Sequence, residues 1–180
     1  IGDNVKRILK ILLVVMYILG NSIVFATAKE ELKITSIAAI VMEQSTGRVL
    51  YEKNMRKRVK IASTTKILTA IVAIENGNLS DKVVVSKKAA GTGGSEVGIV
   101  AGSEVTLESL MYGMLLKSGN DCAVAIAEHI GGSVETFAKM MNKKAYEIGA
   151  KDTNCTNPHG LDTENNYSTA YDMALLAAYA

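Results

Sequence analysis

The sequence predicts an α+β domain in which a helical subdomain packs on an antiparallel sheet. Two strand-length apolar runs come first, at residues 37–42 and 48–51, and a turn separates them. Apolar residues at helical spacing then recur in several longer segments, the first of which begins at Ser63. Strands followed by helices, rather than alternating with them, are typical of α+β proteins.

The two apolar runs are predicted to pair as an antiparallel hairpin. The residues between them, 43–47, end in Gly47, which can adopt a positive φ angle without steric cost. A further short strand is predicted at residues 83–85. Residues 89–95 contain three glycines and are predicted to form a flexible loop, but they lack the spacing of a phosphate-binding loop.

The remaining elements are predicted to be helices. The first begins at Ser63 and ends at Gly77, with its apolar residues at Ile67, Leu68, Ile71, Val72 and Ile74. Others are predicted over residues 107–116 and 121–130, between Ser133 and Gly149, and from Ser168 or Thr169 to the end, with Thr106 and Ser133 as N-caps.

The amino-terminal 28 residues have the pattern of a secretory signal peptide. Lys6, Arg7 and Lys10 precede an apolar run over residues 11–19, and the small residues at 26–28 predict cleavage after Ala28. The alternative is a membrane-spanning anchor. However, Gly20, Asn21 and Ser22 interrupt the run before the ~18–20 apolar residues that a bilayer requires. We therefore expect an exported protein.

Composition indicates a globular domain that does not bind nucleic acid. Of the 180 residues, 48% are hydrophobic and 21% are charged, which suits a sizeable core with a soluble surface. The chain has 20 basic and 18 acidic residues, and residues 1–28 hold three of the former and one of the latter, which leaves 17 of each. A neutral domain without Trp offers neither a basic stripe nor a stacking platform.

The cysteines do not predict a metal site. Cys122 and Cys155 lie in different segments without the spacing of metal ligands. Outside the cytosol they could form one disulfide, and the alternative that we favour is two separate semi-buried thiols. No metal and no cofactor are expected.

Ser63 and Lys66 are the first pair of residues that could carry chemistry. A serine hydroxyl is a poor nucleophile unless a neighbouring base takes its proton, and a lysine held partly neutral can act as that base. Positions i and i+3 of a helix share a face, so Lys66 can reach Ser63. The helix N-terminus would favour both an unprotonated Lys66 and a developing oxyanion. The alternative is an N-cap serine with an exposed lysine.

A second polar element, Ser118-Gly119-Asn120, separates two apolar helices. Its hydroxyl could relay a proton and its amide could hold a substrate carbonyl. The alternative is a simple turn in which Gly119 adopts positive φ and Asn120 caps the next helix. The histidines are weaker candidates, because His129 lies on an apolar helix and His159 lies in a turn.

Taken together, these segments resemble the serine-type D-Ala-D-Ala carboxypeptidases, the low-molecular-weight penicillin-binding proteins. The resemblance rests on Ala62-Ser63-Thr64-Thr65-Lys66, on Ser118-Gly119-Asn120-Asp121 and on Asn157-Pro158-His159-Gly160-Leu161, and it extends from about residue 37 to the end. It implies the penicillin-binding/β-lactamase-like serine hydrolase fold, with residues 29–180 as the amino-terminal part of the catalytic domain.

The resemblance also implies a mechanism. Ser63 would attack the carbonyl between the two terminal D-alanines of a peptidoglycan stem peptide, and water would release the acyl-enzyme. Lys66 would be the base, Ser118 a proton relay and Asn120 a substrate-orienting group. β-Lactam antibiotics would acylate Ser63 and act as inhibitors. Such a protein would work in the cell envelope, and peripheral membrane association is left open.

One feature of the family is missing from the chain. The third motif, Lys-Thr-Gly on a strand that lines the site, does not occur in the 180 residues. In the family this motif lies downstream, so we expect a catalytic domain truncated at its carboxyl end. Two alternatives stay open: a β-lactamase, which commonly has Asp where this chain has Gly119, and a non-catalytic peptidoglycan-binding module.

Overall fold

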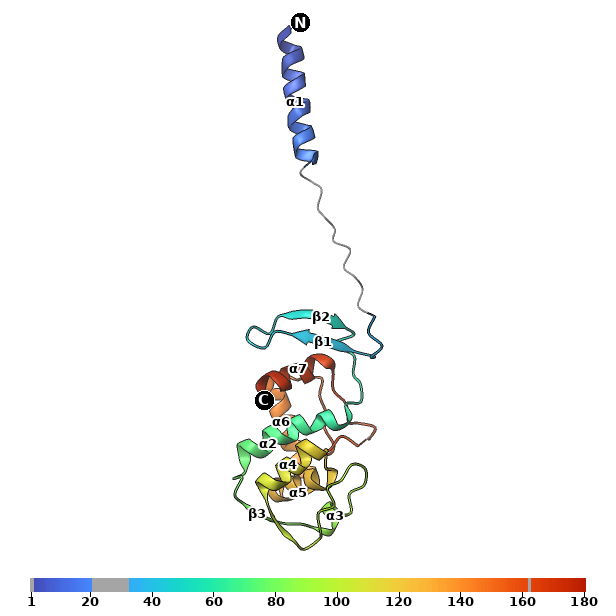
Figure 1. The fold of residues 1–180 in the computed structure, drawn as a ribbon, viewed down its shortest axis with the longest axis vertical. Helices are drawn as coiled ribbons and strands as arrows, with labels where there is room; N and C mark the ends of the chain where they lie inside the picture. The colour runs from blue at the N-terminus through green and yellow to red at the C-terminus, as the bar shows by residue number, and fades with distance from the viewer. Residues whose placement is uncertain (1, 21–32, 162) are drawn as a thin grey trace. The chain divides into compact units, whose positions relative to one another are not determined.

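The computed structural model describes residues 2–20, 33–161 and 163–180 (Figure 1). The chain divides into two compact units, residues 1–34 and residues 35–180. The first unit contains helix α1 (Gly2–Gly20), which includes the basic residues and the apolar run of the predicted signal peptide. No helix in the described part of the chain is long and apolar enough to cross a membrane. The predicted cleavage site lies outside the described residues.

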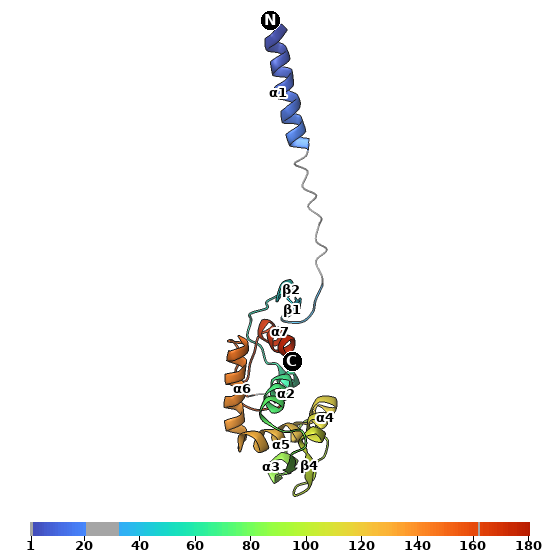
Figure 2. The ribbon, with the colours of Figure 1, turned by 90° about the vertical axis from the view of Figure 1, so that its left-hand side faces the viewer.

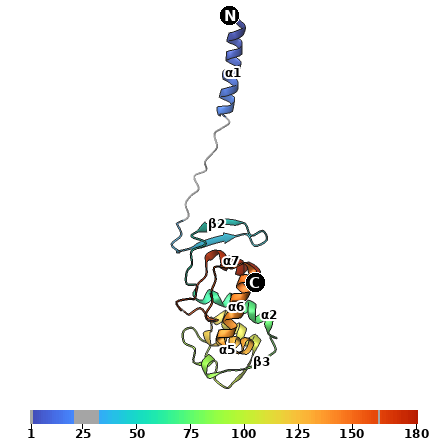
Figure 3. The same cartoon turned by 180° about the vertical axis from the view of Figure 1, so that it is seen from behind.

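The second unit begins with the predicted hairpin. Strands β1 (Ala39–Met42) and β2 (Val49–Lys53) pair antiparallel, with a register irregularity between Val41 and Met42. Gly47 has φ +70°, as the turn prediction requires. The hairpin packs on helix α7 (Ala170–Tyr179), and the two lie together in Figures 1 and 3.

The helices agree with the apolar periodicity. A 3-10 turn, η1 (Ala62–Thr64), leads into α2 (Thr65–Asn76), and α4 (Leu107–Lys117), α5 (Asn120–Gly131), α6 (Val134–Ile148) and α7 follow. The predicted caps are present: the Thr106 hydroxyl accepts from Ser109 N, and the Ser133 hydroxyl accepts from Thr136 N. Of the two residues proposed to open the last helix, Thr169 is the cap, since its hydroxyl accepts from Asp172 N.

A second small sheet lies at the opposite end of the unit from the hairpin (Figure 1). Strand β3 (Lys82–Val84) pairs antiparallel with β4 (Glu104–Thr106), which the sequence analysis missed. Between them, α3 (Lys87–Ala90) takes the first two residues of the predicted loop, because the Ser86 hydroxyl caps it by accepting from Ala89 N. The fold class is confirmed: helices combine with antiparallel sheets.

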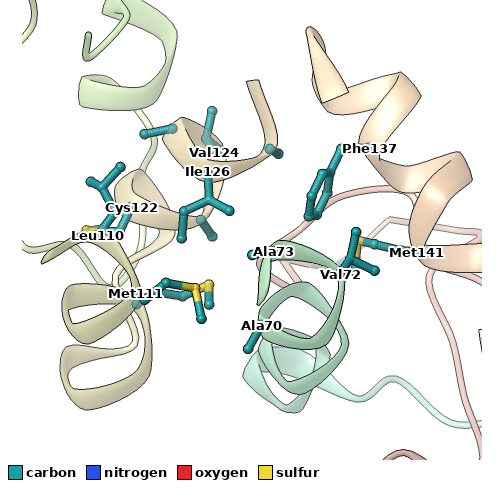
Figure 4. Close-up of a cluster of buried hydrophobic side chains, with 14 of the residues drawn as sticks. Ala70, Val72, Ala73, Leu110, Met111, Cys122, Val124, Ile126, Phe137 and Met141 are labelled. Atoms are coloured by element: carbon teal, nitrogen blue, oxygen red, sulfur yellow. The ribbon is translucent and has the colours of Figure 1, made fainter. Parts of the chain in front are cut away.

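The core lies around α2. Figure 2 shows α2 between α6 on one side and α4 on the other, and Figure 4 shows its small residues facing both neighbours. Ala73 is fully buried between Phe137 of α6 and the α4–α5 pair. Burying such aliphatic and aromatic side chains stabilises the fold by roughly 1.5–3 kcal/mol each. This packing holds the amino end of α2 next to the α4–α5 connection.

Candidate active site

Ser63 lies on a tight, strained turn at the amino end of α2. Ala62, immediately before it, has φ +46°, a conformation that costs a residue with a side chain roughly 1–2 kcal/mol. The backbone of Gly160 presses against this turn so closely that a Cβ atom there would lie 1.8 Å from Ala62 O. Ser63 itself is exposed. The surrounding structure therefore holds an exposed hydroxyl on a constrained turn.

Lys66 is the buried centre of the site. Its side chain is on the first turn of α2, and the residue is only 3% exposed. Its Nζ lies 3.2 Å from Ser63 Oγ, 3.2 Å from Ser118 Oγ, 2.7 Å from Asn120 Oδ1 and 3.1 Å from His159 O. The alternative of an N-cap serine with an exposed lysine is wrong, because Lys66 is buried and the N-cap of α2 is Thr64.

Burial makes the ammonium of Lys66 easier to deprotonate. Burial lowers the pKa of Lys66 below its ordinary value of 10.5, since a low-dielectric surrounding disfavours the ammonium. Carbonyl oxygens can only accept hydrogen bonds, so a neutral amine would direct its two N–H groups to Asn120 Oδ1 and His159 O. Its lone pair would then be left for a serine hydroxyl. This arrangement can withdraw a proton from Ser63.

Ser118 and Asn120 come from the α4–α5 connection. Ser118 ends α4 in the left-handed conformation, with φ +57°, and Asn120 is the first residue of α5. The alternative of a simple turn with positive φ at Gly119 is wrong in that detail, because the φ of Gly119 is −61°. Gly119 is needed for space instead: a Cβ atom would lie 2.9 Å from both Asp121 Oδ1 and Val97 Cγ2. Nor does the Asn120 side chain cap α5.

The turn at residues 157–161 contributes a partner that reasoning from residue types missed. Asn157 Oδ1 accepts hydrogen bonds from His159 N and Gly160 N, at 3.2 and 2.7 Å, which directs His159 O toward Lys66. Thr69 Oγ1 of α2 donates to Pro158 O at 2.6 Å and fixes the turn against the helix. A backbone carbonyl cannot be recognised from residue type, because every residue has one. Only the resemblance of residues 157–161 to the family indicated that this segment belongs to the site.

His159 contributes its carbonyl rather than an acid–base side chain. Burial, and secondarily the charge of Lys66, lower the pKa of His159 to about 4. Its Nδ1 accepts from Leu161 N at 3.1 Å, which agrees with a neutral ring that shapes the loop. His129 is elsewhere, with Nε2 3.2 Å from Asp81 Oδ2 on the surface.

Cys122 and Cys155 are free and buried, so the preferred reading of two separate thiols is confirmed over the disulfide. Burial is the main cause that raises the pKa of each thiol to about 12. Among the described residues, no group of three His, Cys, Asp or Glu side chains could hold a metal ion.

Solved structures that share the fold include a D-alanyl-D-alanine carboxypeptidase and a penicillin-binding protein. D-alanyl-D-alanine carboxypeptidase DacD from Francisella tularensis has a TM-score of 0.79 and 41% identity, over 82% of this chain and 37% of that one. Penicillin binding protein 5 from Haemophilus influenzae has a TM-score of 0.77 and 35% identity, over 82% of this chain and 45% of that one. The fold is thus that of this class of serine hydrolase.

The sequence comparisons identify the family. The family described as D-alanyl-D-alanine carboxypeptidase matches residues 25–180. D-alanyl-D-alanine carboxypeptidase DacF of Bacillus subtilis is 44% identical over 183 residues, which cover 96% of this chain and 47% of that protein. DacA of Haemophilus influenzae is 37% identical, over 82% of this chain and 39% of that protein. The chain belongs to the D-alanyl-D-alanine carboxypeptidase family, and it spans less than half the length of these two relatives.

Proposed function

We propose that this chain carries the nucleophile of a serine D-Ala-D-Ala carboxypeptidase that trims peptidoglycan stem peptides. The observation that carries the proposal is the position of Lys66 Nζ, which lies 3.2 Å from both Ser63 Oγ and Ser118 Oγ. A buried amine between two hydroxyls suits acyl transfer, because it can take a proton from one hydroxyl while the other passes a proton to the leaving group. The family supports the substrate class.

In the acylation step, neutral Lys66 takes the proton of Ser63 as Oγ attacks the carbonyl carbon between the two terminal D-alanines. The tetrahedral intermediate collapses when the C–N bond breaks, and the terminal D-alanine leaves as an amine. Its nitrogen receives the proton from Lys66 through the Ser118 hydroxyl. Asn120 orients the peptide. The product is an ester between Ser63 Oγ and the shortened peptide.

In the deacylation step, water attacks the same carbonyl carbon and the ester bond to Ser63 breaks. The Lys66 amine takes a proton from the attacking water and returns one to Ser63 Oγ, so the enzyme regains its starting form. β-Lactam antibiotics would enter at acylation, because their strained amide presents a carbonyl to the same hydroxyl. The relatives described as penicillin-binding proteins support this inhibitor class.

The test is covalent labelling of the full-length protein with a fluorescent penicillin. We expect a stable ester on Ser63 in the wild type and none in Ser63→Ala, with the labelled peptide identified by mass spectrometry. Release of D-alanine from a synthetic stem pentapeptide would establish the reaction. Rapid turnover of the penicillin would favour a β-lactamase, and a folded protein that neither labels nor releases D-alanine would favour a binding module.

We further propose that residues 1–28 are a signal peptide and that the protein acts in the cell envelope. Helix α1 contains the basic residues and the apolar run that an export signal needs, and the proposed substrate lies outside the cytosol. The mass of the protein recovered from the envelope tests this proposal. A mature form that begins at Lys29 is expected, and a form that retains the leader would contradict it.

A further inference from the structure

In the loop between α3 and β4, residues 91–103, three consecutive backbone N–H groups bind one carboxylate. Asp121 Oδ2 accepts hydrogen bonds from Val97 N at 3.1 Å, Gly98 N at 2.8 Å and Ile99 N at 3.1 Å. Its Oδ1 accepts from Val97 N at 3.1 Å and from Cys122 N at 2.9 Å. Loop backbone that is not part of a helix or sheet needs other partners for its N–H groups. Asp121 provides them for residues 97–99.

This carboxylate is an internal structural charge. Asp121 is 1% exposed and lies on the first turn of α5. Burial raises the pKa of its carboxyl, but the backbone N–H donors outweigh that effect and leave the pKa below its ordinary value. Hydrogen bonds to a charged acceptor are about twice as strong as neutral ones. The cluster therefore ties an exposed glycine-rich loop firmly to a buried helix.

The same loop also holds Asn120, the residue next to Asp121. Gly93 O accepts from Asn120 Nδ2 at 2.9 Å, and Ser95 O accepts from Asn120 N at 2.7 Å. The first contact decides which way the amide faces, because a carbonyl can bond only to the NH₂ end. Asn120 Oδ1 is then left to accept from Lys66 Nζ at 2.7 Å. The orientation of a proposed active-site amide thus depends on where the loop lies.

We propose that Asp121 is a positioning residue that acts through the loop of residues 91–103 to orient the Asn120 amide toward Lys66. The inference rests on the proposed function for its activity readout. Asp121 touches neither Ser63 nor Lys66 through any contact that the structure describes, so its effect on acylation passes through Gly93 O and Asn120. A substitution at Asp121 and a substitution in the loop next to Asn120 should therefore both slow the acylation of Ser63.

The first variant acts on the carboxylate. Asp121→Asn keeps the size of the side chain but places an NH₂ group among the N–H donors of the loop, which removes acceptors and adds donor–donor repulsion. We expect the second-order rate constant for penicillin labelling of Ser63 to fall about tenfold, which corresponds to ~1.4 kcal/mol. Asp81→Asn is the control, because it removes a carboxylate that pairs with His129 on the surface.

The second variant acts from the loop side and leaves Asp121 intact. A Cβ atom at Gly94, which has φ +89°, would lie 2.6 Å from Asn120 Nδ2. Gly94→Ala should therefore displace the amide and reduce labelling about tenfold, as a misplaced positioning group does. Gly102→Ala is the matched control: its φ is +82° and nothing lies within 4 Å of the added Cβ. It carries the same backbone strain and should label within about twofold of wild type.

A double-mutant cycle separates positioning from general loss of stability. If Asp121 acts through Asn120, Asp121→Asn should reduce labelling less than about threefold when Asn120 is already Ala, because the two effects are not additive. Thermal unfolding of each variant identifies any that fail to fold. If the effects of Asp121→Asn and Asn120→Ala are fully additive, or if both Asp121→Asn and Gly94→Ala label normally, the inference about Asp121 is overturned and the proposed function is not. Absence of label in the wild type overturns the proposed function and the inference with it.

Discussion

Replacement of Gly160 tests whether the turn before Ser63 is held by close backbone packing. In Gly160→Ala the new Cβ atom would lie 1.8 Å from Ala62 O and 2.4 Å from Ala62 C. Cβ atoms essentially never approach other heavy atoms closer than 3.0 Å, so one of the two backbones must move by about 1 Å. Both partners are main chain, and no flexible side chain can absorb the shift.

The structure sets the size of the effect. Gly160 has φ +84°, and a left-handed conformation costs a residue with a side chain roughly 1–2 kcal/mol. Overpacking adds roughly 1–3 kcal/mol, so the free energy of unfolding should fall by roughly 2–5 kcal/mol. A displacement of about 1 Å at a reacting group can reduce the rate about 100-fold. Movement of Gly160 would also displace the adjacent His159 O, which lies 3.1 Å from Lys66 Nζ.

The assay combines penicillin labelling of Ser63 with thermal unfolding of the same full-length samples. Gly132→Ala is the control, since Gly132 has φ +71° and nothing lies within 4 Å of the added Cβ. It should lose only the roughly 1–2 kcal/mol of backbone strain and label at the wild-type rate. A folded Gly160→Ala protein that labels within about twofold of wild type would refute the reasoning.

Four further predictions follow from the buried titratable groups. Lys66→Ala should reduce labelling of Ser63 by about 100-fold or more, because the proton acceptor is lost, and equal labelling would exclude Lys66 as the base. Burial lowers the pKa of Lys66 below 10.5, so at a pH between the two values the unfolded chain binds a proton that the folded chain does not. The free energy of unfolding should therefore rise with pH toward 10.5. Urea titrations at several pH values should show that Lys66→Met abolishes this rise. Burial and the Lys66 charge lower the pKa of His159 to about 4, so the contribution of His159 to stability should be complete above pH 6.5 and be lost as the pH falls from 6.5 to about 4; the decrease should be less steep in His159→Gln. Cys122 and Cys155, with pKa values of about 12, should resist iodoacetamide in the native protein and react only after denaturation; rapid native alkylation would contradict their burial.

Sequence reasoning identified most elements because their signals are local. Helical periodicity, the caps at Thr106 and Ser133, and the turn at Gly47 depend on residues a few positions apart, and the structure contains each of them. Strand β4 was missed because only three residues pair, and its partner β3 lies about 20 positions earlier. So short a strand has no period to detect, and only the finished sheet defines it.

The simple-turn alternative assigned positive φ to Gly119, and the sequence could not show why this is wrong. A glycine between two helices usually allows positive φ, but here Ser118 adopts that conformation and Gly119 makes room for Val97 and Asp121. Val97, one of the two groups that a Cβ atom would meet, lies in a loop more than 20 residues away in the chain. Close approach and backbone conformation both select glycine, and the residue type alone does not distinguish them.

The sequence by itself determined the pairing of Ser63 with Lys66, because residues three apart at a helix start share a face whatever surrounds them. It also predicted the family, through several segments in a characteristic order. Only the tertiary structure decided that Lys66 is buried and that Ser118, Asn120 and His159 O converge on its amine. Those partners lie 52 to 93 positions away in the chain. The packing of α2 against its neighbours brings them together, and that packing depends on the whole core.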